Sequence, residues 1–170
     1  AVAHAGLTAA NPPLMQWAQS LVTEVAATPY AFKMTSALCE LLALAIVMAL
    51  VVRLHLPPAM IIAAAWHPIG PLFFTGAGHT DALMAVPLVL GVLLAHMGKR
   101  HGGLIATTIA ALLRPFGAVA LLPQLLGRAW WWWALPALAA VVAYLPFTDG
   151  LGFGVLRGLS DHATTLHFHG

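Results

Sequence analysis

The sequence predicts an all-α protein, a polytopic transmembrane helical bundle in which some helices are broken or half-length. Hydrophobic residues make up 61% of the chain and charged residues only 7%, and the mean hydropathy is +0.91. Apolar runs close to the ~20 residues that cross a bilayer alternate with short polar turns, and prolines interrupt some of them. A water-soluble domain normally carries about 25% charged residues, so the composition excludes that class.

The first half of the chain contains a surface helix, one clear span and one broken span. Residues 11–29 open with a proline pair suited to a helix start but are too polar to cross, which indicates a short helix at the membrane surface or lining a cavity. Residues 31–52 form the clearest span. The run 57–74 is expected to break near His67, because a residue that precedes proline is biased out of the helical region.

The second half continues with a span over residues 80–97 and an apolar stretch over 103–126 that Arg114-Pro115 divides. Two half-length passes of about 11 residues would each cover roughly 16 Å, short of a ~30 Å hydrocarbon core. The alternative is a single proline-kinked helix, long enough to cross alone. A last span covers residues 130–147.

Basic residues orient the spans, since short cytoplasmic loops are enriched in lysine and arginine. Arg53, Lys99, Arg100 and Arg128 lie in short turns and should share the cytoplasmic side, which favours the hairpin over the kinked helix. The polar groups then converge on one extracytoplasmic cavity: Glu24, the turn 76–81, Arg114, Asp149 and the tail 157–170.

Asp81 is one of only five acidic residues in the chain, and it lies at the head of the span 80–97. A charged group in an apolar segment costs several kcal/mol and marks a functional site by default. A role in helix capping, with Thr80 as the N-cap, is the structural alternative. Capping does not account for His79 or for Gly78, which lets a backbone approach a ligand.

Arg114 precedes a proline in the middle of an apolar stretch. As a structural residue it would pair with an acid or with freed carbonyl groups. As a functional residue it is a fixed cation whose planar fork suits a phosphate held at two points. The cost of an unpaired arginine in hydrocarbon favours the functional interpretation.

Other classes of site find little support in the sequence. The seven lysine and arginine residues are scattered, so no basic stripe for a nucleic acid is present. The pair His167 and His169 matches no strong zinc pattern, and we predict no metal and no cofactor.

Taken together, the motifs resemble the multipass GT-C glycosyltransferases, and among them the bacterial polyprenol-phosphate-mannose-dependent mannosyltransferases. The family's "WNP" phrase corresponds to Trp66-His67-Pro68, and its "GHNDALM" phrase to residues 78–84. The family's "KP" corresponds to Arg114-Pro115. "NPPLMQ" at 11–16 is similar to the family's "YPPLxQ", and the likeness runs over nearly the whole chain. The replacement of asparagine by His67 and Thr80, and of lysine by Arg114, departs from the pattern.

The resemblance implies a transferase of the cell envelope, in a bacterial plasma membrane, with its site facing outside. It would move mannose or a similar hexose from a polyprenyl-phosphate donor to a glycan or lipid-linked acceptor, with membrane lipids as its other partners. The residues that would bind the donor are His67, Gly78, His79, Thr80, Asp81 and Arg114.

The resemblance also implies that residues 1–170 are one partial transmembrane domain. The family's catalytic aspartate lies in the first outer loop, which we expect upstream of Ala1, and further spans are expected downstream. The catalytic residue is therefore unknown. Two other functions stay open: a secondary transporter, since those also contain broken helices and buried charges, and a non-catalytic membrane subunit in which Asp81 and Arg114 lock helices together.

Overall fold

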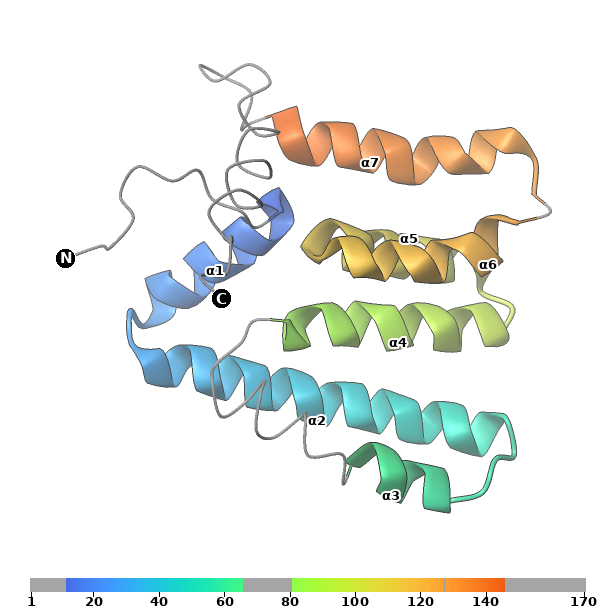
Figure 1. The fold of residues 1–170 in the computed structure, drawn as a ribbon, viewed down its shortest axis with the longest axis horizontal. Coiled ribbons are helices and arrows are strands. Elements are labelled where there is room, and N and C mark those ends of the chain that lie inside the picture. Colours follow the sequence, from blue (N-terminus) through green and yellow to red (C-terminus); the bar gives the residue numbers. More distant parts are fainter. Residues whose placement is uncertain (1–11, 66–80, 127, 146–170) are drawn as a thin grey trace, which may run out of the picture.

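The computed structural model describes residues 12–65, 81–126 and 128–145. Over these ranges every regular element is a helix (Figure 1), which confirms the all-α prediction. Two of the elements, η2 and η3, are 3-10 helices. The elements in chain order are α1 (Pro13–Val25), α2 (Pro29–Arg53), α3 (Ala59–Ala65), α4 (Ala82–His96), α5 (Arg100–Leu113), η2 (Pro115–Leu121), α6 (Leu122–Leu125), η3 (Trp130–Trp133) and α7 (Ala134–Tyr144).

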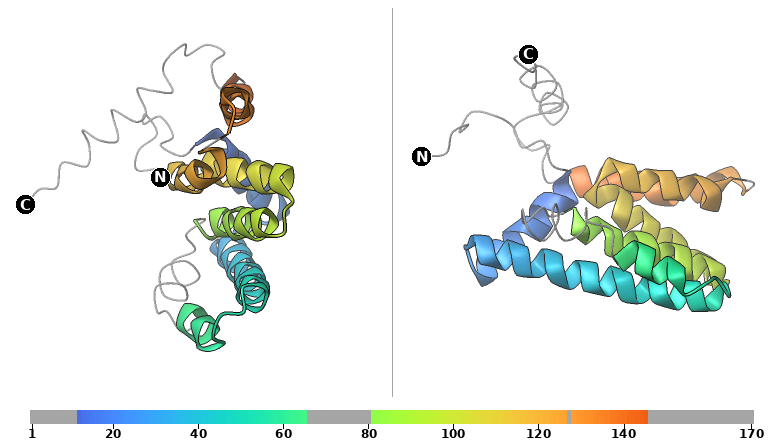
Figure 2. Two further views of the ribbon diagram at one scale, coloured as in Figure 1. Left: turned by 90° about the vertical axis from the view of Figure 1, so that its right-hand side faces the viewer. Right: turned by 60° about the horizontal axis from the view of Figure 1, so that its bottom comes forward.

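The longer helices are stacked side by side, with α4 between α2 and α5 (Figures 1 and 2). The η2–α6 segment lies beside α5 in the same layer. α7 forms the outer edge of the stack on the side opposite α2 and α3. α1 crosses the end of the stack at which α2 begins and contacts α5, α2 and α7. The expected short helix over the polar N-terminal segment is thus present.

Within the described residues, one helix, α2, is long and apolar enough to cross a membrane. It begins at Pro29, after an N-cap at Thr28 whose side chain accepts a hydrogen bond from the backbone N–H of Ala31 at 3.3 Å. It ends at Arg53, whose charge is favourable beside the last carbonyl groups of the helix. Three shorter apolar segments accompany it: Ala82–His96, Pro115–Leu125 and Trp130–Tyr144.

Four basic residues lie at one end of the stack, as the sequence predicts. α2 and α4 end there, α5 begins there, and α6 ends there close to the start of η3 (right-hand side of Figure 1). This end, which we call the basic end, therefore carries Arg53, Lys99, Arg100 and Arg128. Arg128 makes a cation–π contact with Trp132, since its guanidinium carbon lies 4.7 Å from the ring centroid.

The chain reverses direction at Arg114, so the predicted hairpin is present and the single kinked helix is wrong. Arg114 is extended, with φ −148° and ψ 136°, and Pro115 begins η2. The returning segment packs against α5: Gln124 Nε2 donates a hydrogen bond of 3.2 Å to Thr107 Oγ1. The backbones approach most closely at Gly117, where a Cβ atom would lie 2.5 Å from the carbonyl carbon of Ala110.

A second close approach joins α4 to α5. A Cβ atom on Gly91 would lie 2.5 Å from Thr107 Cγ2 and 3.0 Å from the carbonyl oxygen of Gly103. The turn between the two helices contains Gly98 at φ +78°, a left-handed conformation that glycine adopts without strain. Small residues at such contacts let helices pack backbone to backbone.

The interior is small and the apolar surface is large. The buried cluster consists of Leu104, Leu121 and Leu125, with Ala111 and Trp132 packed against it. Many large apolar side chains are exposed instead, including Leu41 at 65%, Phe116 at 81% and Trp130 at 80%. Helices that present such side chains outward leave an apolar face that water does not solvate well.

Candidate functional site

Asp81 immediately precedes α4, and its side chain does not cap that helix. Its backbone is already helical, with φ −61° and ψ −26°, and its carbonyl oxygen accepts a hydrogen bond of 3.0 Å from the N–H of Met84. The carboxylate makes no capping hydrogen bond with the first turn. The Asp81 side chain is therefore not itself a hydrogen-bonding cap, and the alternative with Thr80 as the N-cap concerns a residue outside the described ranges.

Arg114 lies at the reversal between α5 and η2, and its backbone is held on both sides. Its N–H donates to the carbonyl oxygen of Ala110 at 3.0 Å, and its own carbonyl oxygen accepts from the N–H of Gly117 at 2.9 Å. Pro115 prevents α5 from continuing, because a residue before proline is pushed to extended backbone. These constraints fix the point from which the guanidinium projects.

An ion pair joins the two residues, from Nε of Arg114 to Oδ1 of Asp81. The pairing follows from helix length: α4 has 15 residues and α5 has 14, so the chain returns to the level at which α4 began. The paired atoms are themselves shielded from solvent. The side chains stay partly open, since Arg114 is 28% and Asp81 36% exposed.

The exposure of the pair limits what it adds to stability. Ion pairs of partly exposed side chains typically contribute ~0.2–1 kcal/mol in water. The pair links Asp81, directly before α4, to Arg114, directly after α5. It is therefore a weak clamp in water and becomes costly to break only where water is excluded.

Chemically, the pair places a cation and an anion next to each other at the end of the stack opposite the basic end, which we call the pair end. A guanidinium has five N–H donors, and Nε is the nitrogen of Arg114 that approaches Asp81. Such a fork suits phosphate oxygens, whereas a carboxylate accepts hydrogen bonds from hydroxyl groups. The arrangement can bind a ligand that carries both an anionic group and hydroxyl groups.

The structure brings two of the six predicted site residues together, Asp81 and Arg114. The other four, His67, Gly78, His79 and Thr80, lie outside the described residues. Glu24, in the last turn of α1, lies at the pair end and is exposed.

Metal ligation finds no support in the described ranges. In residues 12–65, 81–126 and 128–145, no group of three or more histidine, cysteine, aspartate or glutamate side chains could hold a metal ion. Comparison with protein-family models, with curated proteins and with solved structures finds no match for this chain.

Proposed function

We propose that the chain is part of a polytopic membrane transferase that moves mannose, or a similar hexose, from a polyprenyl-phosphate donor to a glycan or lipid-linked acceptor. The observation that carries the proposal is the Asp81–Arg114 ion pair, which lies at one end of a stack of apolar helices. A cation and an anion at the ends of two apolar helices form a polar site. In the proposal, the sugar phosphate of a lipid-linked donor binds there while its polyprenyl chain lies in the membrane.

Membrane placement is supported by α2, which has the length and apolar character to cross, and by the exposed apolar side chains of the other helices. The grouping of basic residues at one end supports an orientation with that end in the cytoplasm. The pair end then faces outside. α4, at 15 residues, and α5, at 14, are each about 22 Å long, so each is shorter than a ~30 Å core.

In the proposed complex, Arg114 binds the phosphate of the donor, and its affinity is highest at a depth where water is scarce. Asp81 accepts hydrogen bonds from the sugar hydroxyl groups and keeps Arg114 oriented when no donor is bound. His67, Gly78, His79 and Thr80 complete the donor site in the proposal. We assign the catalytic base to none of these residues.

A non-catalytic membrane subunit is the second candidate, and the same ion pair favours it. In that case Asp81 and Arg114 serve only to hold α4 to α5, and no sugar is transferred. The two functions differ in what a substitution changes, because a clamp affects the amount of folded protein whereas a binding site affects turnover.

The test uses membranes that express the complete reading frame and follows labelled mannose from polyprenyl phosphomannose into product. We expect wild type to transfer mannose. Asp81→Asn, compared at matched protein level, should lower the rate about 30-fold, because hydrogen bonds to a charged group are lost while the shape of the side chain is kept. A normal rate in Asp81→Asn would keep the transferase and remove Asp81 from the sugar site. No transfer by wild type, together with a lower protein level in Asp81→Asn, would support the subunit instead.

A further inference from the structure

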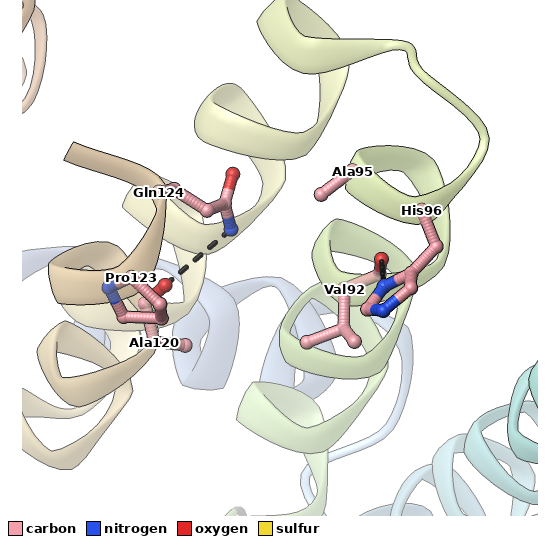
Figure 3. A pocket seen from close by; sticks show the side chains of 6 residues that line it. All are labelled: Val92, Ala95, His96, Ala120, Pro123 and Gln124. Atoms are coloured by element: carbon pink, nitrogen blue, oxygen red, sulfur yellow. Dashed lines mark hydrogen bonds between the residues drawn. The ribbon is translucent and has the colours of Figure 1, made fainter. Parts of the chain in front are cut away.

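A cavity of about 250 Å³ lies between α4 and the η2–α6 segment, near the basic end and away from the ion pair (Figure 3). Its volume is below the range of roughly 300–1,000 Å³ that small-molecule sites occupy, so it suits a stretch of hydrocarbon chain better than a whole ligand. It is lined by Val92, Ala95, His96, Ala120, Pro123 and Gln124.

The walls of the cavity are mostly apolar, and its two polar side chains are held by neighbouring groups. His96 Nδ1 lies 3.0 Å from the carbonyl oxygen of Val92, which can only accept, so Nδ1 carries the hydrogen. Gln124 Nε2 donates to Thr107 Oγ1 and, at 3.4 Å, to the carbonyl oxygen of Ala120. Figure 3 shows the two helices facing each other across the space, with the small and apolar side chains between them.

Two basic residues, Lys99 and Arg100, follow the cavity-lining His96 within about one helical turn of sequence. Lys99 is three residues after His96, and its carbonyl oxygen accepts from the N–H of Gly103 at 2.9 Å. A Cβ atom on Gly103 would lie 3.1 Å from Gln124 Oε1, so the first turn of α5 adjoins the cavity wall. Lys99, the N-cap of α5, and Arg100, its first residue, are exposed.

No acidic residue lines the cavity in the part of the chain that the structure describes. The acidic residues there are Glu24 and Asp81 at the pair end and Glu40 in the middle of α2. An apolar groove that opens beside exposed cations and has no described carboxylate at its own end is complementary to a molecule with a hydrocarbon chain and an anionic head.

From this complementarity we propose that the cavity holds one acyl chain of an anionic membrane phospholipid, whose phosphate is bound by Lys99 and Arg100. The proposal rests on membrane placement and not on sugar transfer, so the two can fail separately. In the proposed orientation the cavity lies close to the cytoplasmic leaflet, in which anionic lipids meet juxtamembrane basic residues. The bound lipid fills a gap between α4 and α6 that the side chains leave open.

The experiment measures bound lipid on the purified full protein by native mass spectrometry, after exchange into detergent with equal amounts of dioleoyl phosphatidylglycerol and dioleoyl phosphatidylcholine. We expect one retained phosphatidylglycerol on wild type. Lys99→Gln and Arg100→Gln should each lower the preference for phosphatidylglycerol about fivefold, the contribution of one basic residue near a membrane surface. Arg53→Gln, at the same end but on α2, is the matched control and should leave the preference unchanged.

Occupancy of the cavity is tested by filling it. Ala95→Leu and Val92→Phe introduce bulk from two different turns of α4 and should each remove the retained lipid. Ala118→Leu, on η2 but outside the cavity, should keep it. Equal retention of the two lipids by wild type would overturn the proposal, as would full retention by whichever filled variant folds, or an equal effect of Arg53→Gln.

Discussion

Replacing Arg114 by glutamine is expected to lower kcat/KM for the polyprenyl-phosphate donor by about 100-fold or more. Hydrogen bonds to a charged group contribute ~1.5–3 kcal/mol each, and the donor phosphate would lose its fixed cation. Glutamine keeps much of the length of the side chain but not its charge or its fork. The measurement is mannose transfer at several donor concentrations, at matched protein level.

Two further variants separate the contribution of the planar guanidinium group of Arg114 from that of its positive charge. Arg114→Lys retains the charge but cannot bind two phosphate oxygens in one plane, so its kcat/KM should fall between those of wild type and Arg114→Gln. Lys33→Gln removes an exposed cation from the first turns of α2, at the same end of the stack, and should have little effect. Transfer by Arg114→Gln at the wild-type rate would remove Arg114 from the donor site.

Replacing Gly117 by alanine is expected to lower the free energy of unfolding by about 3 kcal/mol, the upper part of the range for overpacked sites. The added Cβ would lie 2.5 Å from the carbonyl carbon of Ala110, 2.6 Å from its oxygen and 2.7 Å from the nitrogen of Ala111. Backbone atoms inside a helix cannot move aside as a side chain can. Denaturant unfolding of the purified protein, followed by circular dichroism, measures the change.

Gly102→Ala is the matched control on the neighbouring helix α5. Its Cβ would meet only the end of the Leu94 side chain, at 3.3 Å, which can rotate away. Alanine is a better helix former than glycine by about 1 kcal/mol, so this variant should be as stable as wild type or more stable. If Gly117→Ala proved equally stable, the close packing of η2 on α5 would be wrong.

Helix positions could largely be predicted because hydropathy and proline act locally. The run 31–52 predicted α2, which extends from Pro29 to Arg53, and the break at Arg114-Pro115 follows from the restriction that proline places on its neighbour. The hairpin required one further argument, the grouping of basic residues. The packing partners could not be predicted, since the contacts of Gly91 with Thr107 and of Gly117 with Ala110 depend on which faces meet.

The candidate site could be predicted residue by residue but not as a pair. Asp81 and Arg114 were each identified by the cost of a charge in an apolar segment, and pairing with an acid was one interpretation of Arg114. Their contact depends on the similar lengths of α4 and α5, which become known only once the ends of both helices are fixed. The cavity beside His96 and Gln124 gave no signal in the sequence, because it arises from packing between helices that are distant along the chain.

The most direct test of the central claim, that the Asp81–Arg114 pair binds the donor, exchanges the two charges. The double variant Asp81→Arg with Arg114→Asp retains mutual attraction but moves the cation to the start of α4. With the complete reading frame expressed in membranes, we predict wild-type protein level in the double variant and no transfer of labelled mannose, alongside transfer by wild type. Recovery of transfer in the double variant would show that only the attraction matters, and absence of transfer by wild type would contradict the proposed function itself.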